Sequence, residues 1–186
     1  MTAFKKVSKT GVIFVTSEAS KLGFYRGNPE WCNFGQGQPE VGKLPGGLDR
    51  IESIEIPQLD NEYSPSAGLK QLREQIANTY NELYRKNKKS KYTFENVSIA
   101  AGGRTLLTRM AASLDNVNLG HFLPDYTAYE ELLSTFTTFN TIPIMLSPED
   151  GYQFTTQNLR DEIMGKGLGA LLISNPCNPT GATIHG

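Results

Sequence analysis

The sequence is short of several residue types, and each shortage excludes a class of protein. It has only two cysteines, Cys32 and Cys177, which lie far apart and fit neither a disulfide framework nor a metal site. Its two histidines, His121 and His185, form no cluster; we place His121 in a strand and assign it no chemistry. We therefore expect no metal centre and no disulfide scaffold.

Excess charge and long apolar runs are also missing. The net charge is −1 over 186 residues, which argues against a nucleic acid or a membrane surface as the main partner. No apolar stretch approaches the roughly 20 residues that span a bilayer. The start at residues 1–6 is followed by no apolar segment of the kind that a secretory signal needs. We therefore expect a globular, cytoplasmic protein.

The order of apolar segments predicts an α/β fold. Helical spacing of three and four residues runs from Gly68 to about Lys86, with Ser66 as the expected N-cap. Beyond this helix, strands and helices alternate with short connections. We expect strands at 96–101, 119–123, 141–146 and 168–174, and helices at 105–114, 126–136 and 157–164. The alternation predicts a three-layer α/β/α arrangement around a mostly parallel sheet.

The first 60 residues have a different composition. Residues 31–47 hold five of the 18 glycines and two prolines, which is typical of a loop with demanding backbone geometry. We expect residues 12–15 to form a short strand or an arm. The chain therefore divides into 1–60, an N-terminal arm and small-domain segment, and 61–186, part of a large domain.

The most informative segment is Asn-Pro-Cys-Asn-Pro-Thr-Gly at 175–181. An apolar run at 169–173 leads directly into it, and such a run before turn residues predicts a buried parallel strand. The prolines stiffen the loop, so two asparagines stand at the carboxyl end of a strand. Open α/β sheets bind ligands at this position. An ordinary turn is the alternative interpretation.

This segment resembles the signature of the class I/II aminotransferases, the fold-type I enzymes that use pyridoxal 5′-phosphate (PLP). In that family the second asparagine donates a hydrogen bond to the phenolic oxygen of the cofactor, and the resemblance gives this role to Asn178. An amide N–H₂ stabilises the negative charge on that oxygen and so tunes the cofactor.

Two further motifs follow the family order. Gly102, Gly103 and Arg104 form a turn at an expected helix N-terminus, where free N–H groups and the dipole favour an anion. The resemblance implies that this turn binds the PLP phosphate; a plain tight turn is the alternative. Arg104 stands where the family commonly has a small or uncharged residue, and it either adds a phosphate contact or points to solvent.

The third motif is Pro-Asp-Tyr at 124–126, which looks like the family's Pro-x-aromatic motif. It implies that Tyr126 stacks on the pyridine ring of the cofactor, since a planar aromatic suits a planar, polarisable group. The alternative is that Tyr126 is a core aromatic of the following helix.

Two motifs lie further upstream. Residues 63–77 resemble the family's Tyr-x-x-x-x-Gly-x-x-x-Leu-Arg segment, which implies that Tyr63 reaches the cofactor phosphate of a neighbouring subunit in a homodimer. Arg73 in this segment is expected to be a surface or interface charge. Gly-Gln-Gly-Gln-Pro at 35–39 resembles the family's Gly-x-Gly-x-Pro loop, which implies that Gly37 approaches the substrate carboxylate; a plain turn is the alternative.

Three groups that the family chemistry requires have no match. They are the Schiff-base lysine, the aspartate that pairs with the pyridine nitrogen, and the arginine that binds the substrate carboxylate. All three normally follow the Asn-Pro-x-Asn-Pro-Thr-Gly loop, so we expect the Schiff-base lysine after Gly186 and assign no catalytic residue within this chain. Lys166 precedes the motif and matches no catalytic position.

The resemblance therefore implies an aminotransferase of amino-acid metabolism that transfers an amino group from an amino acid to a 2-oxo acid. Residues 61–186 would be the N-terminal half of its PLP-binding large domain, an incomplete domain that supplies the cofactor cradle and is inactive alone. One alternative is a PLP-dependent lyase or cyclising synthase of the same fold. Another is a non-catalytic PLP-binding or regulatory domain, or an inactive fragment. The sequence does not indicate the substrate.

Overall fold

The computed structural model describes residues 9, 11–39 and 41–185, without the side chain of Glu130. The chain divides into two units, Met1–Pro57 and Gln58–Gly186. The assignment of 1–60 and 61–186 as domains stays a prediction. Within the described ranges, no helix is both long enough and apolar enough to cross a membrane.

A helix occupies the segment expected to be a short strand or an arm. Helix α1 (Gly11–Lys21) includes residues 12–15, so the strand is wrong, whereas the arm stays a prediction. The strand preference of β-branched residues depends on packing against a neighbouring strand. The described part of this unit contains no strand that could pair with 12–15. The backbone therefore satisfies its hydrogen bonds locally, within a helix.

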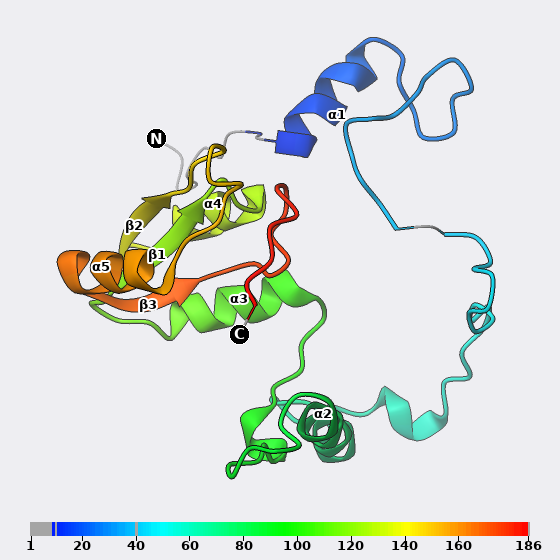
Figure 1. Ribbon diagram of the computed structural model, residues 1–186. Helices are drawn as coiled ribbons and strands as arrows, with labels where there is room; N and C mark the ends of the chain where they lie inside the picture. The colour runs from blue at the N-terminus through cyan, green and yellow to red at the C-terminus, as the bar shows by residue number, and fades with distance from the viewer. Residues whose placement is uncertain (1–8, 10, 40, 186) are drawn as a thin grey trace, which may run out of the picture. The chain divides into compact units, whose positions relative to one another are not determined.

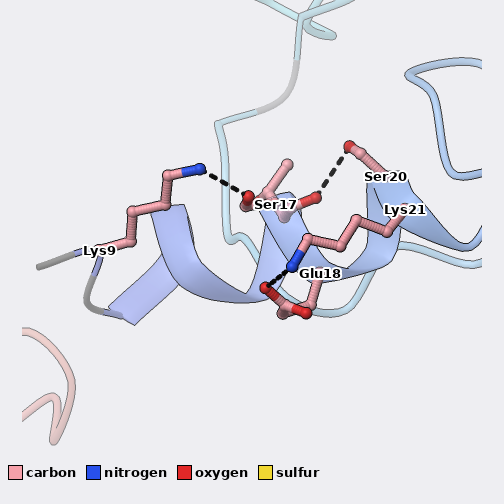
Figure 2. Close-up of polar contacts among 6 residues, drawn as sticks. Lys9, Ser17, Glu18, Ser20 and Lys21 are labelled. Carbon is pink, nitrogen blue, oxygen red and sulfur yellow. Dashed lines mark hydrogen bonds and ion pairs between the residues drawn. The ribbon is translucent and has the colours of Figure 1, made fainter.

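Polar contacts connect side chains along α1 (Figure 2). The Lys9 ammonium donates to the Ser17 hydroxyl at 2.9 Å, and Lys21 pairs with Glu18 at 2.6 Å. Lys21 lies in the last turn, where a cation also interacts favourably with the helix dipole. Exposed ion pairs of this kind contribute at most about 1 kcal/mol, so these contacts add little to the stability of the helix.

The second unit begins with a short 3-10 helix, η1 (Gln58–Asn61), and helix α2 (Lys70–Leu83). The predicted helix is present, but Ser66 is not its N-cap. The cap is Leu69, which makes no side-chain capping bond. The reason is Gly68, whose φ of 94° is readily adopted only by glycine and separates Ser66 from the helix.

The predicted strand at 96–101 is wrong. A short 3-10 helix, η2 (Phe94–Asn96), replaces its start, and Val97 then has extended backbone. Ile99 N–H donates to the Ala67 carbonyl at 2.9 Å, but no strand of the described residues forms a ladder with this segment. Arg73 Nε donates to the Val97 carbonyl at 2.7 Å, so this half-buried arginine connects α2 to the extended segment.

Three parallel strands form the sheet of the second unit, in the order β2-β1-β3. They are β1 (Asn118–Leu123), β2 (Asn140–Met145) and β3 (Leu168–Leu172), which confirms the other three predicted strands. The central strand β1 is buried from residue 119 to 122, as expected for a parallel strand that is covered on both faces. His121 lies within this buried stretch.

Helices cover both faces of the sheet (Figure 1). They are α3 (Gly103–Ala112), α4 (Thr127–Leu133) and α5 (Thr156–Lys166). On one face, Ala111 of α3 and Leu133 of α4 share a core with Leu119. On the other face, Phe122 stacks on Phe154, which precedes α5, with ring centroids 4.9 Å apart. The predicted three-layer α/β/α fold class is confirmed.

Candidate cofactor site

The loops that follow β1 and β3 contact each other. Both strands run in the same direction, so their carboxyl ends lie at the same edge of the sheet. The Ser174 hydroxyl donates a hydrogen bond to the Asp125 carboxylate. Cys177 Sγ lies 3.7 Å from the Pro124 carbonyl oxygen. The Pro-Asp-Tyr motif and the Asn-Pro-Cys-Asn-Pro-Thr-Gly motif are therefore joined in space.

Asp125 and Ser174 are residues that the sequence reasoning missed. The Asp125 carboxylate also accepts a hydrogen bond from the Tyr126 N–H at 2.7 Å, just before α4 begins. Two signals were available in the sequence: an acidic residue inside the Pro-x-aromatic motif, and a hydroxyl directly before the first Asn-Pro pair. Neither signal shows that the two side chains meet.

Arg104 is exposed and contacts Tyr126, and its predicted phosphate contact stays a prediction. Its Nη2 donates to the Tyr126 hydroxyl at 3.2 Å, and its Cζ lies 5.8 Å from the ring centroid. This hydrogen bond raises the pKa of Arg104 above its usual value, so the guanidinium is charged at any working pH. The contact brings the N-terminus of α3 beside the loop after β1.

The turn before α3 leaves open space where an anion could bind. Gly102 is the N-cap, with φ 92° and ψ 149°. A Cβ added at Gly102 or Gly103 would meet no atom within 4 Å. The first N–H groups of a helix have no partner within the helix, and the dipole favours negative charge there. The turn can therefore accept a phosphate group close to the Arg104 cation.

The two asparagines of the loop after β3 have different surroundings. The Asn175 amide donates to the Ile184 carbonyl at 3.2 Å and accepts from the Ile184 N–H at 2.9 Å. Cys177 N–H donates to the Ala182 carbonyl at 2.8 Å and closes the loop. The Asn178 side chain is exposed and makes no hydrogen bond to a residue that the structure describes. Asn175 thus fixes the loop, whereas the amide of Asn178 is available to a ligand.

Tyr126 is not a core aromatic. Its side chain is 36% exposed, and its ring meets the edge of Tyr129 at a centroid distance of 5.6 Å. Burial raises the pKa of Tyr129, and the nearby Asp125, Tyr126 and Cys177 raise it further. Tyr126 thus contacts Tyr129 and Arg104 and stays partly exposed, while Tyr129 is the more enclosed ring.

Two other predicted site residues lie outside the segments described above. Tyr63 is fully exposed. Gly37 is an exposed glycine of the first unit, and an added Cβ would meet no atom within 4 Å. Their roles stay predictions.

The chain belongs to the family of class I and II aminotransferases. The family model matches residues 29–185, which is most of the chain and includes all the residues of the site described above. Members of this family depend on PLP.

Individual relatives agree with this assignment. A probable aspartate/prephenate aminotransferase of Aquifex aeolicus (strain VF5) is 26% identical over 154 residues, covering 82% of this chain and 37% of that protein. Aspartate aminotransferase from Thermus thermophilus with maleate superimposes with a TM-score of 0.54 at 27% identity, covering 66% of this chain and 31% of that one. An alanine aminotransferase from Pyrococcus furiosus gives 0.54 at 26% identity, with 66% and 30% covered. The chain thus spans about a third of the length of these relatives.

Proposed function

We propose that this chain is the part of a PLP-dependent aminotransferase that binds the cofactor, in an enzyme that transfers an amino group from an amino acid to a 2-oxo acid. The observation that carries the proposal is the meeting of three motif segments at one edge of the sheet. Arg104 contacts Tyr126, and the loop containing Asn178 contacts the loop containing Tyr126.

The proposed roles follow from the chemistry of each group. The turn at Gly102 and Gly103 binds the phosphate through the first N–H groups of α3, and the Arg104 cation adds positive charge beside it. A phosphate monoester carries about −1.5 to −2 charges at neutral pH, which matches this positive end of α3. The Tyr126 ring packs against the pyridine ring, and the Asn178 amide donates to the phenolic oxygen.

When bound, PLP supplies an electron-withdrawing ring that stabilises negative charge on the substrate carbon next to the amino group. The residues of this chain orient that ring and balance its charges. Within residues 1–186 no residue is assigned to form the Schiff base or to move a proton. We accordingly expect the isolated chain to bind cofactor without transferring amino groups.

The second subunit is also part of the proposal. Tyr63 is fully exposed, so its hydroxyl is accessible to a neighbouring copy of the protein. We propose that it contacts the cofactor phosphate there, in a homodimer, and that Gly37 approaches the substrate carboxylate. The relatives are named for aspartate, prephenate and alanine. For this protein we propose only the general class of amino acid and 2-oxo acid substrates.

Equilibrium dialysis of the purified chain against PLP tests the cofactor role. We expect saturable binding that inorganic phosphate reduces by competition, and weaker binding of pyridoxal, which lacks the phosphate. An Arg104→Gln variant should lose part of the preference for PLP over pyridoxal. Equal binding of PLP and pyridoxal by the unaltered chain would contradict the assignment of the α3 turn.

The reaction class is tested on the complete natural protein. Given one amino acid and no 2-oxo acid, an aminotransferase stops after a single half-reaction, with one keto acid formed per site. Continued product release under these conditions would favour the lyase alternative.

A further inference from the structure

The Asp125 carboxylate accepts two hydrogen bonds, one from its own loop and one from a loop that is distant in the sequence. One donor is the N–H of Tyr126, the next residue, at 2.7 Å. The other is the hydroxyl of Ser174, 49 residues further along. Ser174 is half-buried and lies two residues after the end of β3. One carboxylate thus connects the ends of two parallel strands.

We propose that Asp125 and Ser174 are positioning residues that fix Asn178 relative to Tyr126. This inference rests on the proposed function, because it concerns two walls of the same cofactor site. Asp125 is bonded to the backbone of Tyr126, and Ser174 is four residues before Asn178. The contact between them sets the spacing between the ring that packs on the cofactor and the amide that bonds to its phenolic oxygen.

The alternative connections between these loops are weaker. Cys177 Sγ approaches the Pro124 carbonyl at 3.7 Å, and a thiol is a poor hydrogen-bond donor. Hydrogen bonds to an ionised carboxylate are roughly twice as strong as neutral ones. Without the Ser174 hydroxyl, the hydrogen bonds between Asn175 and Ile184 still close the loop on itself, but they do not join it to the segment of Asp125.

The test uses the full chain with Ser174→Ala, Ser174→Thr and a matched control, Ser113→Ala. Among the described residues, the Ser113 hydroxyl bonds only to the Met110 carbonyl, at 2.7 Å, within α3 and its cap. We expect Ser174→Ala to weaken PLP binding about tenfold, the effect of one charge-assisted hydrogen bond. Ser174→Thr, which keeps the hydroxyl, should restore binding to within about threefold, and Ser113→Ala should bind PLP normally.

Two further measurements distinguish the positioning role of Asp125 and Ser174 from a purely structural role. Inorganic phosphate should compete equally well in all variants, because the α3 turn does not depend on Ser174. In a double-mutant cycle, adding Ser174→Ala to Asp125→Ala should weaken PLP binding no further, since the two side chains act through one bond. Additive losses, or parallel losses of phosphate and PLP affinity, would overturn the inference.

Hydrogen exchange separates failure of the inference from failure of the proposed function. Amides of residues 175–181 should exchange faster in Ser174→Ala than in the unaltered chain, with or without cofactor. Unchanged exchange overturns the inference even if PLP binds. If the unaltered chain binds no PLP, the proposed function fails, and the positioning role fails with it; faster exchange would then show only that Ser174 anchors the loop.

Discussion

Alanine substitutions at the two glycines of the α3 turn test whether the turn needs glycine for its backbone conformation or for lack of space. Gly102 and Gly103 are adjacent, and a Cβ at either would meet no atom within 4 Å. They differ in backbone conformation. Gly102 has φ 92° and ψ 149°, whereas Gly103 is the first residue of α3. Alanine is compatible with the second conformation and not with the first.

The expected magnitudes follow from these angles. The Gly102 conformation borders the region that is essentially restricted to glycine, and a side chain there costs about 1–3 kcal/mol. Alanine at Gly103 relieves the entropy cost of a helical glycine, which is at most about 0.5–1 kcal/mol. Gly102→Ala should therefore be less stable than Gly103→Ala by about 1.5–4 kcal/mol.

Urea unfolding followed by circular dichroism measures this difference. Both variants should unfold with the same dependence on urea concentration, so that the midpoints report stability directly. Gly102→Ala should shift the midpoint down relative to the unaltered chain, and Gly103→Ala should leave it unchanged or raise it. Coincident midpoints for the two variants would refute the argument that the turn depends on a glycine-only conformation.

Three other predictions concern the loops. Tyr126→Ala should weaken PLP binding by about 0.5–1.5 kcal/mol, or roughly twofold to twelvefold, while Tyr126→Phe keeps the ring and should bind PLP more tightly than Tyr126→Ala. Asn178→Ala should weaken PLP binding without changing the free energy of unfolding, whereas Asn175→Ala should lower the free energy of unfolding by about 1 kcal/mol. The pKa of Tyr129 is raised above 10.0 in the folded chain. The contribution of this phenol to stability is therefore complete below pH 10 and is lost as the pH rises through the folded pKa. Tyr129→Phe should accordingly flatten the fall in stability above pH 10.

Each of these three has a contradicting result. Equal PLP affinity for the alanine and phenylalanine variants of Tyr126 would mean that the ring does not contact the cofactor. A loss of stability in Asn178→Ala as large as in Asn175→Ala would mean that both asparagines are structural. An unchanged stability profile in Tyr129→Phe between neutral and strongly alkaline pH would show that this phenol does not titrate differently on folding.

Much of the fold follows from local patterns. The apolar runs at 119–123, 141–146 and 168–174 correspond to β1, β2 and β3, and the periodic segment after Gly68 corresponds to α2. These elements were predictable because burial imposes a spacing on neighbouring residues that can be seen in the sequence.

The errors have two physical causes. The segments at 12–15 and 96–101 have strand-like composition, but a strand forms only beside a partner, and the described residues provide none for either segment. The cap of α2 was misplaced because Gly68 adopts a positive φ between Ser66 and the helix. Both causes lie outside what the composition of a short window can show.

By itself the sequence determined the elements of the sheet and the order of the motifs at Gly102, Tyr126 and Asn178, because both depend on residues that are close together in the chain. Only the tertiary structure decided which of these groups meet. The Arg104–Tyr126 contact spans 22 residues and the Asp125–Ser174 contact spans 49, and the second joins the loops of two strands that are adjacent in the sheet. The tertiary structure also distinguished Asn175, which is bonded to Ile184, from Asn178, whose amide is exposed. Such contacts depend on the order and register of β1 and β3, and that pairing is a property of the folded chain.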